Sequence, residues 1–286
     1  MLKLRLITSC ILIPIVIAGL FLCSLPWFAV IMIVISMLAA WEWTALSGIV
    51  SFKKRVSMTL LFGLIIFIYT LSLMFELEWI LSWFNLINIL QVSLIWWTIA
   101  TLLVLFYPSS ALFWPTSYLL RLIFGVLTLL PFFCGMLFLR QYNYVVDHHA
   151  GSWLILYLML LIWGMDSGAY LCGKMFGKHK LLPRVSVGKT WEGLFGGLLT
   201  AGCVFYFLYL FIPFRISFSS LFVCSLSAVL ISIFGDLTES MFKRAAGIKD
   251  SSNLIPGHGG VLDRIDSLTA AIPIFASLQL LLVGVF

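Results

Sequence analysis

Asp236, Glu239, Ser240 and Lys243 are spaced so that all four lie on one face of a helix. They follow the uncharged run 216–235, so a polar stripe continues an apolar segment. A charge at mid-bilayer costs about 2.5–3.5 kcal/mol on insertion scales, and acidic residues near membrane depth therefore face a partner, a cation or a water-filled cavity. For Asp236, the alternative is a helix end that simply emerges into water.

The segment that follows adds cations, glycines and carboxylates before the last apolar run: Lys243-Arg244, Lys249-Asp250, Pro256-Gly257-His258-Gly259-Gly260 and Asp263-Arg264-Ile265-Asp266. Glycines let a backbone approach a ligand closely, and free N–H groups at a helix N-terminus bind anions, so we expect a phosphate here. Asp263 and Asp266 share the first turn of the last helix, and with Asp236 they could offer oxygen ligands to Mg²⁺. A histidine between glycines, such as His258, is more typical of a hydrogen-bonded loop than of a metal ligand.

A third polar segment spans residues 166–193, beginning at Asp166 and ending beyond Glu192. Its five Lys and Arg side chains would attract a polyphosphate or an anionic lipid headgroup: Lys174, Lys178, Lys180, Arg184 and Lys189. The alternative is that they only orient the chain in a membrane. Gly188-Lys189-Thr190 has the ending of a P-loop, but Pro183 stands where the first glycine is required, which excludes that motif.

The composition indicates the elements that must position these residues. The chain of 286 residues is 63% hydrophobic and 10% charged, whereas soluble domains are roughly a quarter charged. Its mean hydropathy is +1.14. Repeated apolar runs are long enough to cross a hydrocarbon core of about 30 Å. We therefore expect an all-α, polytopic transmembrane bundle of about nine spans, near residues 6–24, 27–48, 56–75, 86–107, 118–139, 152–171, 193–213, 217–238 and 264–286.

The basic residues favour a cytoplasmic N-terminus. With that orientation, Lys53-Lys54-Arg55 and both basic segments described above fall on the cytoplasmic side, as the positive-inside rule requires. Asp147-His148-His149 then lies on the opposite side, and we interpret it as a solvated connection. The formal charge of +6 is thus explained without nucleic acid. A cleaved signal peptide is the alternative for the first span, although no small-residue cleavage site is evident.

Charge is concentrated in the second half of the chain. Residues 166–266 hold seven of the eleven acidic and ten of the seventeen basic residues. We expect residues 1–150 to form a transmembrane scaffold of about five spans and residues 151–286 to form a catalytic region with two cytoplasmic polar loops. The six cysteines are scattered without C-x-x-C spacing, which indicates neither a zinc site nor a disulfide framework.

The run from Ser240 to Asp266 resembles the signature of the phosphatidate cytidylyltransferase (CDP-diacylglycerol synthase) family. It matches that signature at Ser, Lys-Arg, Lys-Asp, His-Gly-Gly and Asp-Arg-x-Asp. The segment from Asp166 to Gly193 also resembles the family, except at Val187, where proline is usual, and Trp41-Glu42-Trp43 is similar to an early acidic position. The resemblance implies a homodimer with a metal site in a polar cavity that opens to the cytoplasm, and Asp236 and Asp263 as metal ligands.

By the same resemblance, the expected reaction transfers a cytidylyl group from CTP to phosphatidic acid, with Mg²⁺ as cofactor and a second cation left open. The short N-terminus, without a transit peptide, favours a bacterial inner membrane, where the enzyme would contact membrane lipid. Residues expected to be catalytic are Lys243, Arg244, Lys249, Asp250, His258, Arg264 and Asp266. The basic residues and His258 would contact phosphates, and Asp250 and Asp266 would lie near the metal as ligands or supports. Residues expected to hold the substrates are Asp166, Lys180, Ser186, Lys189, Thr190, Glu192 and Glu239.

Two classes of membrane protein compete with this interpretation. A transporter for an anionic solute would also place charges among interrupted helices, but it predicts repeat symmetry between the halves, which we do not find. Another lipid enzyme, such as a polyprenol kinase or a CDP-alcohol phosphotransferase, is the second alternative. The latter requires a D-G-x-x-A-R…G-x-x-x-D-x-x-x-D pattern that the sequence lacks.

Overall fold

A computed structural model of the chain describes residues 2–75, 85–212, 216–257 and 259–283, with side chains from residue 8 onward. Its elements, in chain order, are the helices α1 (Leu2–Phe21), α2 (Leu25–Leu46), α3 (Phe52–Met74), α5 (Leu86–Leu105), the 3-10 turn η1 (Ser109–Leu112), α6 (Tyr118–Arg140) and α7 (Ala150–Phe176), the strands β1 (Lys180–Leu182) and β2 (Ser186–Thr190), and the helices α8 (Trp191–Phe211), α9 (Phe218–Ala245) and α10 (Leu262–Val283).

Eight of the described helices, α2 to α10, are long and apolar enough to cross a membrane, and α1 contributes a shorter apolar stretch, Thr8–Phe21. The all-α prediction of about nine spans is therefore confirmed, and each predicted span overlaps one helix. Side chains also mark where helices begin. Asn85 accepts a hydrogen bond from the Ile87 N–H, and Ser217 accepts one from the Ser220 N–H, as N-cap residues do.

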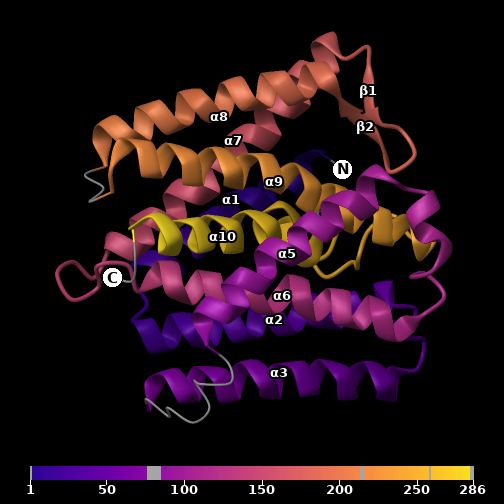
Figure 1. The fold of residues 1–286 in the computed structure, drawn as a ribbon, viewed down its shortest axis with the longest axis horizontal. Coiled ribbons are helices and arrows are strands. Elements are labelled where there is room, and N and C mark those ends of the chain that lie inside the picture. Colours follow the sequence, from indigo (N-terminus) through magenta and orange to yellow (C-terminus); the bar gives the residue numbers. More distant parts are fainter. Residues whose placement is uncertain (1, 76–84, 213–215, 258, 284–286) are drawn as a thin grey trace.

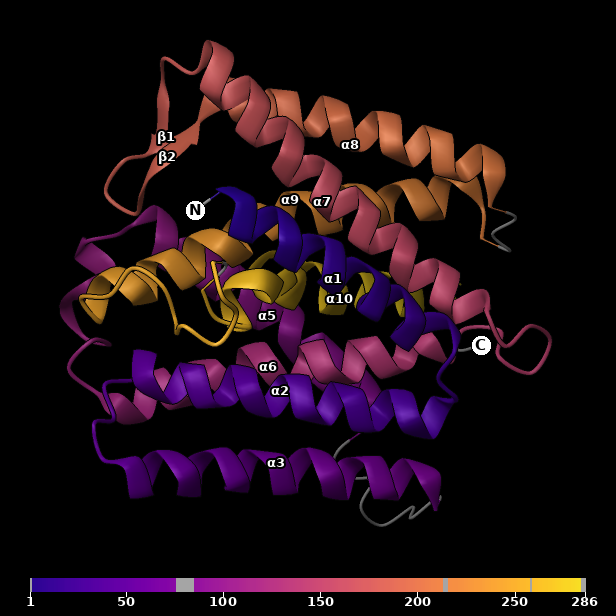
Figure 2. The ribbon, with the colours of Figure 1, turned by 180° about the vertical axis from the view of Figure 1, so that it is seen from behind.

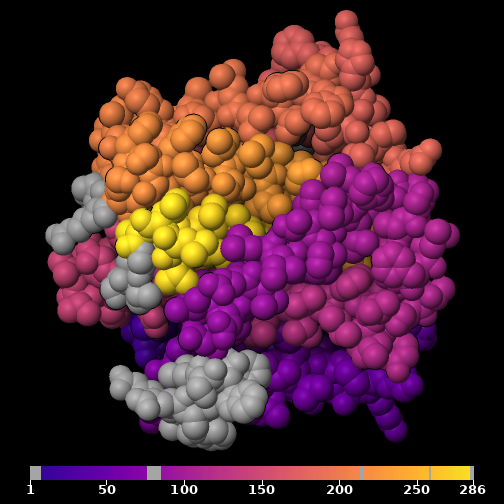
Figure 3. Space-filling view, viewed as in Figure 1, coloured from indigo at the N-terminus to yellow at the C-terminus, as the bar shows by residue number. Residues whose placement is uncertain are grey.

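The core lies around α10, which packs against α9, α6 and α5. In Figure 3, α10 appears as a yellow patch between α9 and α5. Figure 2 shows α1 and α7 crossing the opposite face. α3 and α8 form the two edges (Figure 1), and α8 exposes large apolar side chains such as Leu199 and Phe211. Because each span in a bilayer faces either lipid or other helices, these exposed apolar edges fit contact with lipid chains.

The connections with most of the basic residues gather at one end of the bundle, which we call the hairpin end (Figures 1 and 2). β1 and β2 form an antiparallel hairpin there, with Lys180 paired to Thr190. The first turn of α3, with Lys53 to Arg55, and the connection 246–261 lie at the same end. The sequence predicted this segregation of basic connections, but it did not predict strands.

Aromatic packing fixes α9 at the hairpin end. The ring of Phe242 lies 5.2 Å from Trp43 of α2, 4.8 Å from Trp114 and 6.0 Å from Phe124 of α6. Such pairs contribute about 0.5–1.5 kcal/mol beyond the area that they bury. Phe242 therefore anchors the last two turns of α9 next to α2 and α6, and the polar residues of that segment are held in place.

Gly235 permits close contact between α9 and α10, and we expect its replacement by alanine to destabilise the protein. A Cβ atom at this position would lie 2.6 Å from the Asp266 carbonyl oxygen and 3.2 Å from the Ser267 Cα, which are backbone atoms that cannot move away alone. Overpacking of this kind costs about 1–3 kcal/mol. Gly235→Ala should therefore melt several degrees below wild type in detergent, followed by tryptophan fluorescence.

Gly202→Ala is the matched control, because a Cβ on this α8 glycine meets nothing within 4 Å. Alanine favours a helix over glycine by up to about 1 kcal/mol, so this variant should melt at or slightly above the wild-type temperature. Equal melting of the two variants would mean that α9 and α10 are not packed closely at Gly235.

Candidate active site

A cavity of about 490 Å³ opens at the hairpin end between α7, the hairpin, α9 and α10. Ten of the residues singled out from the sequence line it, which joins the three polar segments into one site: Asp166, Ser186, Lys189, Thr190, Asp236, Lys243, Asp250, Asp263, Arg264 and Asp266. Carboxylates and cations are therefore interleaved around one space. Apolar side chains, among them Leu194 and Ile233, complete the wall.

Lys189 joins the hairpin to α9. Its Nζ lies 3.0 Å from Asp236 Oδ2 and donates to the Ile233 carbonyl oxygen at 3.0 Å. The other carboxylate oxygen of Asp236 accepts a weak hydrogen bond from Ser240 Oγ at 3.3 Å. Both Lys189 and Asp236 retain partial exposure to the cavity, at 23% and 32% of their side chains. This ion pair can therefore exchange partners when an anion or a cation enters.

Lys243 lies between two carboxylates on a more buried wall. Its Nζ is 2.8 Å from Asp263 Oδ1 and 3.3 Å from Glu239 Oε1. The Glu239 side chain is only 3% exposed, and neither of its carboxylate oxygens makes a hydrogen bond within the described chain. The ion pair with Lys243 is then the main compensation for its charge. Lys243 thereby holds the two acidic helices, α9 and α10, together.

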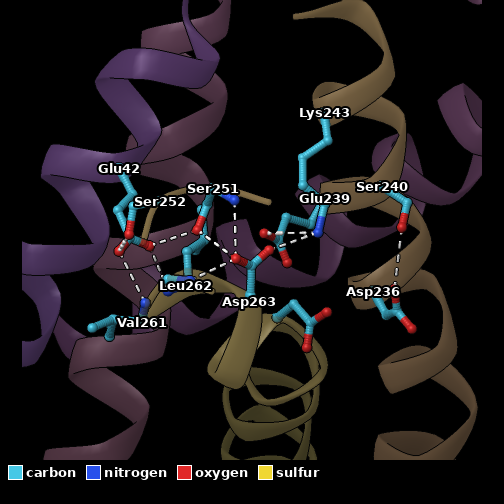
Figure 4. Close-up of polar contacts among 12 residues, drawn as sticks. Glu42, Asp236, Glu239, Ser240, Lys243, Ser251, Ser252, Val261, Leu262 and Asp263 are labelled. Carbon is cyan, nitrogen blue, oxygen red and sulfur yellow. Dashed lines mark hydrogen bonds and ion pairs between the residues drawn. The ribbon is translucent and has the colours of Figure 1, made fainter. Parts of the chain in front are cut away.

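Asp263 is the most fully bonded carboxylate of the cavity (Figure 4). Its Oδ2 accepts hydrogen bonds from Ser251 N at 2.9 Å, Ser251 Oγ at 2.9 Å and Gly260 N at 2.7 Å. Its Oδ1 is the atom that Lys243 contacts. Asp263 thus ties the start of α10 to the connection 246–261 on one side and to α9 on the other.

Behind this connection, Glu42 of α2 is completely buried. Its carboxylate accepts hydrogen bonds from Ser251 Oγ at 2.8 Å, Ser252 Oγ at 2.6 Å, Val261 N at 2.9 Å and Leu262 N at 2.7 Å. The last two are free N–H groups at the start of α10, where a negative charge is favourable. Sequence reasoning found Glu42 only as part of a resemblance, because its partners lie more than two hundred residues away.

Asp166, Asp236 and Asp266 all line the cavity, and their like charges repel one another. Among the described residues, no three His, Cys, Asp or Glu side chains are grouped tightly enough to hold a metal ion by themselves. Mg²⁺ is usually bound by only one or two carboxylates together with waters and substrate phosphates. The donors at this site are carboxylate oxygens around a shared cavity, so their chemistry fits Mg²⁺ without a complete protein cage.

Comparison with known proteins identifies the family. The model of the Cytidylyltransferase family matches residues 3–282. The chain belongs to the cytidylyltransferase family. A phosphatidate cytidylyltransferase of Haemophilus influenzae is 43% identical over 284 residues, covering 96% of this chain and 98% of the relative. One of Pseudomonas aeruginosa is 44% identical over 282 residues, covering 97% of each chain.

A further relative matches a shorter part of the chain. The phosphatidate cytidylyltransferase of Staphylococcus aureus strain COL is 46% identical over 124 residues, covering 43% of this chain and 48% of the relative. The family resemblance seen in the sequence is thus confirmed by two matches over nearly the whole length and by one over a shorter segment.

Five predicted site residues of this cytidylyltransferase lie outside the cavity wall among the described residues: Lys180, Glu192, Glu239, Arg244 and Lys249. Lys180 is exposed on β1, Lys249 is exposed in the connection, and Arg244 is exposed beside the Val185 carbonyl oxygen. Glu192 pairs with His179 at 2.7 Å. His258 lies outside the residues that the structure describes. The roles predicted for all six remain predictions.

Thr190 caps a helix and also lines the cavity. Its hydroxyl accepts a hydrogen bond from Gly193 N at 3.1 Å and so caps α8. Val187, the position where the sequence departs from the family, lies in β2 and is 66% exposed. A valine fits an extended strand, and here the segment needs no proline to form the hairpin.

Proposed function

We propose that this cytidylyltransferase converts CTP and phosphatidic acid to CDP-diacylglycerol and pyrophosphate. Two relatives that match nearly the whole chain bear the name phosphatidate cytidylyltransferase. The observation on which the proposal rests is one cavity, lined by cations and carboxylates, at the end of a bundle of apolar helices. A water-soluble triphosphate and the headgroup of a lipid can meet there while the acyl chains stay in the bilayer.

In the proposed reaction, an oxygen of the lipid phosphate attacks the α-phosphorus of CTP. The new P–O bond forms as the bond between the α-phosphorus and the bridging oxygen breaks, and pyrophosphate leaves with the electron pair. The lipid phosphate is ionised at neutral pH, so the reaction needs no strong general base. The task of the protein is to position two polyanions and to stabilise the charge that develops on the leaving group.

Cationic side chains from three elements of the cavity wall suit that task. Lys189 reaches the cavity from the hairpin, and Lys243 and Arg264 reach it from α9 and α10. Lys243 and Arg264 would contact phosphates, joined by Arg244 from the last turn of α9 and by Lys249 and His258 of the connection. Lys180, Ser186, Lys189 and Thr190 would hold CTP or the lipid phosphate.

We assign Asp236 and Asp263 as the residues that would hold Mg²⁺, with Asp250 and Asp266 supporting them. When bound, Mg²⁺ supplies charge neutralisation at the phosphates. Asp236 is suited to this role because its hydrogen bond from Ser240 is long, at 3.3 Å, and its side chain is 32% exposed. Asp166, Glu192 and Glu239 would help to shape the substrate site.

We also propose that the protein lies in a bacterial inner membrane as a homodimer, with the cavity facing the cytoplasm. The bacterial sources of the relatives support the membrane assigned. Basic connections at the hairpin end support the orientation, because Lys and Arg are enriched on the cytoplasmic side.

Position-specific labelling of CTP tests the proposed reaction. Purified protein in phosphatidic acid vesicles should transfer radioactivity to lipid from α-labelled CTP and release pyrophosphate, whereas γ-labelled CTP should leave the lipid unlabelled. Transfer of the γ-label would identify a lipid kinase. Uptake of an anionic solute without CTP turnover would identify a transporter. Vesicles without phosphatidic acid provide the control.

A further inference from the structure

We infer that Glu42 is a positioning residue of the active site, which holds the connection 246–261 and the start of α10 so that Asp263 faces the cavity. This inference rests on the proposed function. Glu42 belongs to α2, far from the polar segments in sequence, and it is not part of the cavity wall among the described residues. Its effect on the reaction must therefore act through the residues that it contacts.

The chemistry of the Glu42 contacts favours positioning. Four neutral donors bond this buried carboxylate, two serine hydroxyls and two backbone N–H groups, and among the described residues it takes part in no ion pair. A carboxylate accepts through both oxygens, and each Glu42 oxygen receives two of these bonds. These four hydrogen bonds fix the connection through Ser251 and Ser252, and they fix the start of α10 through Val261 and Leu262.

One shared donor links Glu42 directly to Asp263. Ser251 Oγ lies 2.8 Å from Glu42 Oε2 and 2.9 Å from Asp263 Oδ2, so the hydroxyl stands between the two carboxylates (Figure 4). Gly260 closes the same space, because a Cβ added there would collide with Ser251 Oγ and Glu42 Oε2. A displacement of the Glu42 carboxylate is therefore transmitted to the partners of Asp263.

Glu42→Gln is the decisive variant. The amide keeps the size of the side chain but puts an NH₂ group, which only donates, against groups that also donate. Replacement of residues that orient metal ligands costs about 10–100-fold in activity or metal affinity, and we expect the lower end of that range for kcat. The Mg²⁺ concentration that gives half-maximal turnover should rise in parallel, per molecule of folded protein.

Ser252→Ala removes one hydrogen-bond donor to Glu42 and leaves the carboxylate in place. It should therefore lower kcat and raise the Mg²⁺ concentration for half-maximal turnover, each by a smaller factor than Glu42→Gln. Because Ser252 Oγ bonds Glu42, the effects of the two substitutions should not add in the double variant. Ser36→Ala is the matched control. It removes a buried α2 hydroxyl that has no hydrogen-bond partner in the described chain, and it should leave kcat and the Mg²⁺ dependence unchanged.

Limited trypsin digestion gives a readout that is independent of activity. Lys249 is exposed in the connection that Glu42 holds, so cleavage after Lys249 should be faster in Glu42→Gln than in wild type or Ser36→Ala. If Glu42→Gln does not fold, Ser252→Ala serves for the same comparison.

A lower melting temperature with unchanged kcat, Mg²⁺ dependence and cleavage would overturn the inference, because the contact would then be structural only. If wild type fails to transfer the α-label, the proposed reaction is wrong. The cleavage result then still decides whether Glu42 holds the connection, since faster cleavage supports the inference and equal cleavage overturns it.

Discussion

We expect cytidylyl transfer to fall by about 100- to 1000-fold in Asp236→Asn, a range typical for loss of one electrostatic contact to a transition state. The amide keeps the shape of the side chain and can still accept the hydrogen bond from Ser240, so the fold should be retained. It removes the negative charge that faces the cavity and pairs with Lys189. The measurement is transfer of the α-label at saturating CTP over a range of Mg²⁺ concentrations.

Asp263→Asn should lose turnover to a similar extent, and it should also lose stability. Asparagine has one acceptor oxygen, whereas Asp263 accepts from Ser251 and Gly260 through one oxygen and contacts Lys243 through the other. Asp147→Asn is the control for both variants, since this exposed carboxylate precedes α7 at the opposite end of the bundle. Near-normal turnover in either site variant would remove that residue from the proposed metal site.

Lys243→Met should produce the second large effect, a loss of both stability and turnover. Removing one partner of a buried ion pair costs about 3–5 kcal/mol, because the remaining charge is left uncompensated. Here two carboxylates, Glu239 and Asp263, would lose their shared cation. Turnover should fall about 100-fold as well, since Lys243 lines the cavity. Thermal unfolding and α-label transfer measure the two losses separately.

A second substitution separates the loss of stability in Lys243→Met from its loss of turnover. Glu239→Gln in the Lys243→Met background removes the uncompensated buried charge, so the melting temperature should recover towards that of wild type. Turnover should not recover, because the cation is still absent from the cavity. Lys53→Met, on the exposed first turn of α3, is the control. Recovery of both quantities would show that Lys243 is needed only for folding.

Local sequence patterns predicted a large part of the fold. Apolar runs predicted about nine spans, and eight of the described helices are long and apolar enough to cross a membrane. The i, i+3, i+4, i+7 spacing of Asp236, Glu239, Ser240 and Lys243 correctly placed them on one helix, α9, which continues to Ala245. These features depend on residues within two helical turns of one another, so they can be predicted from local sequence spacing. The same spacing could not distinguish Glu239, which is buried beneath the wall, from Asp236, which lines the cavity.

Features that depend on distant partners were not predicted. Residues 180–190 form a hairpin, although the sequence predicted only a connection, because its strands of three and five residues show no alternation of buried and exposed positions. The hydrogen bonds of Glu42 join residues 209 to 220 positions apart, and nothing near Glu42 in the sequence indicates them. The sequence likewise did not indicate a role for Ser251, because that role depends on its position between the carboxylates of Glu42 and Asp263.

The separation between Glu42 and its partners also has a consequence for biogenesis. A ribosome delivers α2 to the membrane 209 to 220 residues before the serines and N–H groups that will bond this glutamate. During that interval the carboxylate must stay hydrated or take up a proton, because a bare charge in lipid is costly. Docking of α10 thus supplies the carboxylate of the early helix with its hydrogen-bond donors, so pairing of this acid and assembly of the cavity occur in the same step.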